Sequence, residues 1–207
     1  MTDIQDSPRR KLKLAVFHNL PVGGGINVVV SLLRQLELFF SVTVHYPEGS
    51  SSPDIQGAIT SKEWPFPAGR NISGFRKLFA PMSLPYRLRK FDLLCHEIAK
   101  EINSTCDLAL VHNSMFVAAP PILKYLKIPS VYFCYEFPRH LYEPELVRRS
   151  GNAFFRFLLS PLRSYEKTMD RESIFRADEI VTFSNWMKSR ISYIYGLDSS
   201  KIGRAHV

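Results

Sequence analysis

A short apolar segment followed by three glycines is the feature that most restricts how this chain can fold. Leu12–Phe17 has the apolar, β-prone character of a buried strand, and it leads into the glycine run Gly23, Gly24 and Gly25. Apolar residues then recur at helical spacing from Val28 to Phe40, and Val42–Tyr46 has the pattern of a second strand. This order of strand, glycine loop, helix and strand predicts a βαβ unit with two parallel strands and a right-handed crossover.

Helix and strand patterns alternate again after residues 49–85, where prolines, serines and glycines predict loops and one short strand near Ala58–Ile59. We expect helices over Leu88–Ile102, Pro120–Leu126, Ala153–Phe175 with an interruption at Pro161, and Asn185–Tyr195, and strands over Leu108–Val111, Val131–Cys134 and Glu179–Phe183. Ser184 is expected to cap the last helix and Gly196 to end it. The predicted fold is an α/β domain with a doubly wound, mostly parallel Rossmann-like sheet of about six strands and helices on both faces.

The ends of the chain call for separate interpretation. We expect residues 1–11 to form a disordered N-terminal tail and residues 12–202 to form a single domain. A further strand is due after Gly196-Leu197-Asp198, and Ile202–Val207 matches the in-frame translation of a common sequencing adapter. We therefore expect residues 203–207 to be an artefactual or truncated end of a longer reading frame.

The cysteines and the hydropathy indicate a cytoplasmic protein. Cys95, Cys106 and Cys134 lie in apolar surroundings, and no C-x-x-C pair offers a zinc or redox site. No stretch reaches the roughly 20 apolar residues of a membrane span, so any membrane contact is expected to be peripheral.

Positive charge predicts an anionic partner. The 27 Lys and Arg exceed the 19 Asp and Glu by 8. Arg70–Phe91 and Arg148–Arg163 combine basic and aromatic residues without acidic ones, which suits contact with anionic lipid on the inner face of the membrane. A solvated face over core aromatics explains these two segments equally well.

Polar side chains follow four of the predicted strands, where open α/β sheets bind their ligands. They are His18 and Asn19, then His112, Asn113 and Ser114, then Tyr135 and Glu136, and finally Ser184 and Asn185. Individually, Ser184 is explained as a helix cap and His112 as a hydrogen-bonded structural residue. Together, on one edge, these residues favour a binding site.

The glycine run leaves several functions open. Backbone N–H groups at a helix N-terminus can receive a phosphate or a sugar hydroxyl, but a tight turn without a ligand would use the same glycines. Val28 occupies the third glycine position of G-x-G-x-x-G, so the dinucleotide fingerprint is not met. Glu48, near the end of the second strand, keeps a nucleotide-binding or NAD-dependent domain as the alternative. The positive charge keeps a nucleic-acid-binding module as a weaker one.

Three motifs give the chain a family resemblance. Leu14–Pro21 followed by Gly23–Gly25, then Tyr132–Arg139, then Arg176–Ser184 with Tyr195-Gly196 are similar to the N-terminal domain of family 4 glycosyltransferases. The resemblance implies the N-terminal half of a GT-B enzyme, which binds the acceptor, while a C-terminal domain absent from this chain holds most of the nucleotide sugar. It also implies transfer with retention of configuration to a glycan or lipid-linked acceptor, no obligatory metal or cofactor, and no nucleic-acid partner.

The resemblance assigns roles residue by residue. Gly23, Gly24 and Gly25 would lie against the donor phosphates and the acceptor, and His112 and Glu136 are the catalytic candidates. The remaining cleft residues would be His18, Asn19, Asn113, Tyr135, Arg139 and Ser184. Tyr135 stands where many family members have histidine, and an ordinary tyrosine pKa near 10 makes it a poor proton shuttle. Without the second domain, we expect the chain alone to be inactive.

Overall fold

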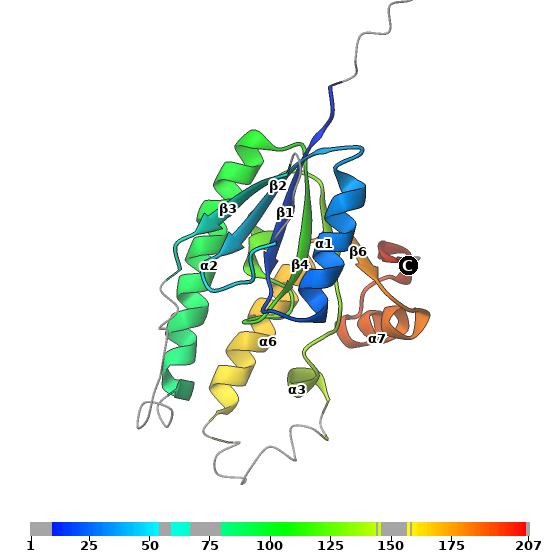
Figure 1. Cartoon of the computed structure of the whole chain (residues 1–207). Coiled ribbons are helices and arrows are strands. Elements are labelled where there is room, and N and C mark those ends of the chain that lie inside the picture. The colour runs from blue at the N-terminus through cyan, green and yellow to red at the C-terminus, as the bar shows by residue number, and fades with distance from the viewer. Residues whose placement is uncertain are drawn as a thin grey trace, which may run out of the picture.

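The chain forms one seven-stranded sheet in which all neighbouring strands are parallel (Figure 1). The computed structural model describes residues 10–53, 59–66, 80–143, 145, 157 and 159–205. The strands are β1 (Lys13–Asn19), β2 (Ser41–Pro47), β3 (Thr60–Trp64), β4 (Leu108–Ser114), β5 (Ser130–Phe133), β6 (Glu179–Thr182) and β7 (Ile202–Arg204). Their order, β3-β2-β1-β4-β5-β6-β7, runs outward from β1 in both directions. The predicted doubly wound, Rossmann-like sheet is therefore confirmed.

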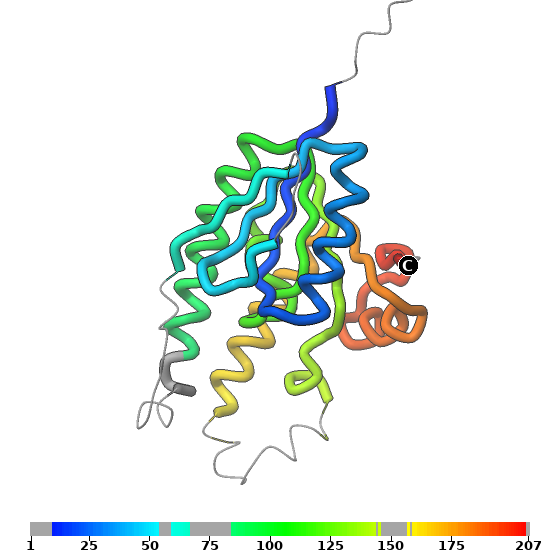
Figure 2. The backbone as a smooth tube through the Cα atoms, in the orientation of Figure 1, coloured from blue at the N-terminus to red at the C-terminus, as the bar shows by residue number. Residues whose placement is uncertain are grey.

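Helices cover both faces of the sheet, as expected. The helical elements are α1 (Gly24–Leu36), α2 (Ala80–Thr105), the 3₁₀ turn η2 (Pro121–Lys124), α3 (Arg139–Tyr142), α6 (Ser160–Ile174), α7 (Asn185–Tyr195) and the 3₁₀ turn η3 (Ser199–Lys201). Figure 2 shows α1 on one side of the sheet, with α2 and α6 on the other.

Successive side chains of β1 point to opposite faces of the sheet, so this strand contributes to a core cluster on each face. Leu14 and Val16 pack in the cluster under α1, while Ala15 and Phe17 pack in the larger cluster that includes residues of α2, α6 and α7. All four side chains are almost fully buried, at 2% exposure or less. The apolar run that opens the sequence is thus the central strand, buried on both sides.

Both predicted ends of α7 are confirmed. The Ser184 hydroxyl accepts a hydrogen bond from the Met187 backbone N–H at 3.1 Å. Gly196 ends the helix in the left-handed region, at φ 70° and ψ 31°. The residue types at these two positions fix the length of the helix.

Two strands differ from the expectation. The strand predicted near Ala58–Ile59 is β3, Thr60–Trp64, an edge strand whose first four residues are exposed, so it lacks an apolar pattern. The second, β7, lies in the stretch similar to adapter sequence, where Ile202 is buried and pairs with Ile180. The sheet has seven strands rather than about six because β7 adds an edge strand to the six predicted ones.

Prolines lie in or next to three of the predicted helices. Pro161 lies in the first turn of α6, where its missing N–H costs no intrahelical hydrogen bond. Of the predicted helical segment before Pro161, residues 153–156 and 158 lie outside the described residues. Pro85 lies inside α2, which begins at Ala80 rather than Leu88. The helix predicted over Pro120–Leu126 is only the 3₁₀ turn η2.

Some expectations concern residues outside the described ones. Most of the 1–11 tail is among them, as are residues 70–79, 148–156 and 158 of the two basic, aromatic segments. Within the described ranges, no helix has the length and apolar character needed to cross a bilayer.

Candidate functional site

The parallel strands bring their carboxyl ends to one edge of the sheet, the lower edge in Figure 1, where α3 and the N-terminal ends of α2 and α6 also lie. Two adjoining pockets occupy this edge. The glycine pocket, about 560 Å³, is lined by Leu20, Pro21, Gly24, Gly25, Val28, Asn113, Ser114, Met115, Tyr135, Glu136 and Phe183. The α3 pocket, about 470 Å³, is lined by Asn113, Ser114, Met115, Phe116, Val117, Ala118, Glu136, Phe137, Pro138, Arg139, His140 and Glu166. Four residues belong to both pockets, and Glu136 is the charged one among them.

The glycine loop opens α1 directly beside the glycine pocket. Gly23 adopts φ 153°, a conformation that favours glycine. A Cβ on Gly25 would lie 3.4 Å from Leu20 Cδ1 and 3.6 Å from Tyr135 Cε2, whereas a Cβ on Gly24 would meet nothing within 4 Å. The first turn of this 13-residue helix carries no acidic residue. Its N–H groups and the positive end of its dipole therefore favour an anionic or hydroxyl ligand here.

His18 and His112 lie beneath this edge and line neither pocket. Both are completely buried, and burial lowers the pKa of His18 to about 4 and that of His112 to about 3, where the nearby His18 adds to the effect. Both rings are therefore neutral at pH 7. Among the described residues, the two ring nitrogens of His18 and the Nε2 of His112 have no hydrogen-bond partner.

Tyr135 joins buried His112 to the glycine loop. Its hydroxyl lies 2.6 Å from His112 Nδ1 and 3.5 Å from the Gly25 carbonyl oxygen. Its ring stacks on Phe183, with centroids 5.6 Å apart and planes inclined by 12°. Burial raises the pKa of Tyr135, so the hydroxyl stays protonated and acts as a hydrogen-bonding group.

The two asparagines at the strand ends hold the surrounding loops. Asn113 donates to the Glu136 carbonyl at 2.9 Å, while its Oδ1 accepts from the Tyr132 hydroxyl and the Tyr135 N–H, both at 3.0 Å. Asn19 donates to Ser114 Oγ at 3.0 Å and accepts from Ser50 Oγ at 2.9 Å. Their amides stabilise the backbone around the pockets.

Charged residues gather around the α3 pocket. Glu136 is exposed, and its carboxylate has no hydrogen bond or ion pair with the described residues. Arg139 pairs with Glu143, with Nε–Oε2 at 2.9 Å, and its side chain is 58% exposed. Glu136 is therefore the available carboxylate where the two pockets meet.

His140 and Glu166 were not predicted as site residues. His140 Nε2 lies 3.0 Å from Glu166 Oε1, and this hydrogen bond raises the pKa of His140. The two residues are 26 positions apart, on α3 and α6, and no local pattern links them. Only the packing of α3 against α6 brings them into one pocket.

Ser184 lines neither pocket, and its described hydrogen bond is the cap of α7. The neighbouring Phe183 does line the glycine pocket. Of the predicted site residues, the structure brings Gly24, Gly25, Asn113, Tyr135, Glu136 and Arg139 to the pockets. Gly23, His18, Asn19, His112 and Ser184 lie behind or beside them.

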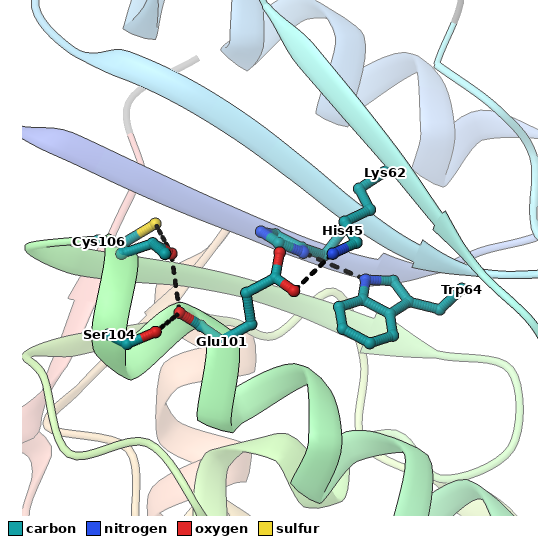
Figure 3. Close-up of polar contacts among 7 residues, drawn as sticks. His45, Lys62, Trp64, Glu101, Ser104 and Cys106 are labelled. Atoms are coloured by element: carbon teal, nitrogen blue, oxygen red, sulfur yellow. Dashed lines mark hydrogen bonds and ion pairs between the residues drawn. The ribbon is translucent and has the colours of Figure 1, made fainter.

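A second polar cluster ties β3 to β2 and α2 (Figure 3). Trp64 Nε1 donates to His45 Nδ1 at 3.2 Å, and Lys62 pairs with Glu101 at 2.5 Å. Burial lowers the pKa of His45 to about 4. Across the described ranges, no three His, Cys, Asp or Glu side chains are grouped so that they could hold a metal ion.

The fold and this edge define a Rossmann-like α/β protein with its pockets at the carboxyl ends of the strands, and comparison with protein families assigns the family. The family model for Glycosyltransferase Family 4 matches residues 22–206, and the chain belongs to this family. No match was found among curated proteins. The predicted family is thus confirmed.

Solved structures agree on the fold. Arabidopsis thaliana UGT89C1 complexed with UDP-L-rhamnose matches with a TM-score of 0.54 and 12% identity, covering 95% of this chain and 52% of its own. Medicago truncatula UGT71G1 complexed with UDP-glucose matches with a TM-score of 0.55 and 13% identity, covering 95% and 51%. The chain therefore spans about half the length of these structures.

Proposed function

We propose that this chain is the N-terminal, acceptor-binding half of a retaining glycosyltransferase that moves a sugar from a nucleotide sugar to a glycan or lipid-linked acceptor. Family membership supports the transferase class. The bound UDP-sugars of the two Rossmann-like structures above support a nucleotide sugar as the donor. As the family resemblance implies, the proposal includes no obligatory metal or cofactor.

One observation carries the acceptor role. The exposed Glu136 carboxylate, which has no hydrogen bond or ion pair among the described residues, lies where the glycine pocket and the α3 pocket meet, at the carboxyl edge of the sheet. A carboxylate accepts hydrogen bonds from hydroxyl groups, and such charge-assisted bonds are among the stronger ones. Glu136 would hold the acceptor hydroxyl beside the donor sugar and orient it for attack.

The glycine loop would meet the donor. The bare N–H groups at the start of α1 would stabilise negative charge on the leaving diphosphate. Most of the donor contacts would come from a second domain, and without them that charge stays largely uncompensated. The chain alone would therefore lack transferase activity.

The test compares the 207-residue chain with the protein encoded by its complete reading frame. Each is incubated with a panel of nucleotide sugars and glycan or lipid-linked acceptors, and release of nucleoside diphosphate is measured. We expect acceptor-dependent release by the longer protein and none by the chain. Turnover by the chain alone would contradict its inactivity, and no turnover by the longer protein would contradict the transferase role.

A specific arrangement also supports docking on the cytoplasmic leaflet of a membrane. The N-terminal ends of α2 and α6 lie at the same edge as the pockets (Figure 1). They carry exposed Tyr86, Arg89 and Lys90 on α2, and exposed Phe157 lies just before α6. Basic and aromatic side chains at one edge favour an anionic lipid surface, which would present a lipid-linked acceptor to the site.

Vesicle sedimentation of the chain tests this docking. We expect binding to vesicles with anionic lipid, weaker binding to neutral vesicles, and loss of binding in Arg89→Gln/Lys90→Gln. Lys100→Gln, near the opposite end of α2, is the matched control and should bind normally. Equal binding to anionic and neutral vesicles would rule the docking out.

A further inference from the structure

We propose that the α3 pocket binds a neutral, hydroxyl-rich sugar ring, and that His140, held by Glu166, accepts a hydrogen bond from one of its hydroxyl groups. This inference deepens the proposed function. It rests on that function only where it identifies the sugar ring as part of the acceptor. It assigns a binding role to two residues that the family motifs do not include.

The contact between His140 and Glu166 decides which ring nitrogen of His140 carries the proton. Its Nε2 lies 3.0 Å from Glu166 Oε1, and the Glu166 side chain is only 12% exposed. A carboxylate accepts hydrogen bonds and does not donate them, so Nε2 carries the proton. In the neutral ring, Nδ1 is then left with a lone pair and acts as an acceptor.

The Nδ1 of His140 and the Glu136 carboxylate are both hydrogen-bond acceptors in the α3 pocket. The His140 side chain is 60% exposed and lines the α3 pocket, and Nδ1 has no hydrogen bond to the described residues. Glu136 lines the same pocket, and its carboxylate, although attracted electrostatically by Arg139, has no hydrogen bond or ion pair among the described residues. Two acceptors in one pocket that have no hydrogen bond among the described residues complement a ligand that donates several hydrogen bonds, and a sugar ring with its hydroxyl groups is such a ligand.

Packing holds this arrangement in place. The Tyr142 hydroxyl on α3 donates to Asp170 Oδ2 on α6 at 2.8 Å, and Asp170 is completely buried. Glu166 and Asp170 are one helical turn apart on α6, so His140 and Tyr142 attach α3 to α6 at two points. The imidazole is therefore oriented before a ligand arrives, which reduces the entropy lost on binding.

Protonation of His140 would reverse its role, because Nδ1 then becomes a donor. The groups that act on His140 are Glu166 and Asp170, which raise its pKa, and Arg163, which lowers it, and the net shift is upward. A neutral hydroxyl-rich ring should therefore bind best above neutral pH and more weakly in mild acid.

The experiment uses ¹⁵N-labelled chain with a panel of neutral sugars: glucose, galactose, mannose, N-acetylglucosamine and maltose. Affinities are taken from chemical-shift titrations at pH 8.5 and pH 5.5, and the tautomer of His140 from its ring nitrogen shifts. We expect at least one sugar to shift amides of residues 113–118 and 136–140, with about tenfold weaker binding at pH 5.5.

Three variants separate this role from a structural one. His140→Gln should bind about tenfold more weakly and lose the pH dependence, and Glu166→Gln should shift the midpoint of the pH dependence downward. His96→Gln is the matched control, since His96 lies 3.5 Å from Glu97 in a surface pair outside the pockets, and it should behave as wild type.

Three results would overturn the inference: no sugar of the panel binds, His140→Gln binds as wild type, or the affinity is equal at both pH values. If none of the sugars binds while the longer protein still releases nucleoside diphosphate, the inference fails and the proposed function stands. If sugars bind as expected but the longer protein transfers nothing, the proposed function fails and the α3 pocket is a sugar-binding site of another kind.

Discussion

At the scale of single residues, neighbouring polar groups at the edge of the sheet have different access to the pockets. His112 and Asn113 follow one another in β4 and both are buried, but Asn113 lines both pockets and His112 lines neither. The hydroxyl of Tyr135 is the described partner of His112 Nδ1. The position where many family members have histidine thus carries a hydrogen bond inside this chain.

Tyr135→Phe tests that hydrogen bond. We expect it to lower the free energy of unfolding by about 1–3 kcal/mol, because it leaves a buried imidazole without its partner. Urea denaturation at pH 7.5 measures the change. Tyr165→Phe, at a side chain that is 41% exposed on α6, is the control and should stay within about 0.5 kcal/mol of wild type. Equal stability of Tyr135→Phe and wild type would show that the bond contributes nothing.

At the scale of secondary-structure elements, one buried carboxylate joins three helices. Asp170 on α6 accepts hydrogen bonds from the hydroxyls of Tyr142 on α3 and Tyr195 on α7, at 2.8 and 2.6 Å, and from the Ala119 N–H at 3.0 Å. Each donor satisfies part of a charge that would otherwise be costly to bury. The wall of the α3 pocket therefore depends on contacts beneath it.

Tyr195→Phe removes one of these donors. We expect a loss of about 1–3 kcal/mol in the free energy of unfolding, since Asp170 loses a buried charge-assisted hydrogen bond. Tyr193→Phe, on the same helix but 81% exposed, should change stability by less than about 0.5 kcal/mol. Similar unfolding midpoints for the two variants in urea would argue against the network.

Elements with a local signal could be predicted, and those defined by distant contacts could not. The apolar run at Leu12–Phe17 and the cap residues Ser184 and Gly196 specify their structures through their own chemistry. The exposed edge strand β3 has no alternation to reveal it. His140 and Glu166 meet only because α3 packs on α6, so the sequence predicted the edge that carries the site but not the pairing within the α3 pocket.

At the scale of the whole molecule, three buried histidines couple stability to pH. His18, His45 and His112 have pKa values lowered by burial to about 4, 4 and 3. The unfolded chain takes up protons near pH 6.5 while the folded chain does not, so the free energy of unfolding falls as pH drops from 6.5 toward 4. Above about pH 7.5 both states are neutral at these positions, and this contribution is constant.

Urea denaturation at pH 8, 7, 6 and 5 measures this dependence. We expect little change between pH 8 and 7 and, below pH 6, a decline approaching about 1.4 kcal/mol per pH unit for each histidine. His18→Leu should remove about one third of the slope, whatever its effect on stability at pH 8. A stability that is level from pH 8 to pH 5 would mean that these histidines are not buried in their neutral form.

The proposed function of the whole molecule depends on an acceptor hydroxyl bound at Glu136. The most direct measurement is kcat/KM for the acceptor in the protein encoded by the complete reading frame, for wild type, Glu136→Gln and the control Glu63→Gln on the exposed edge strand. We predict a fall on the order of 10- to 100-fold for Glu136→Gln, the loss of a charge-assisted hydrogen bond, and no change for Glu63→Gln. Equal kcat/KM values for Glu136→Gln and wild type would contradict the binding of the acceptor hydroxyl at Glu136.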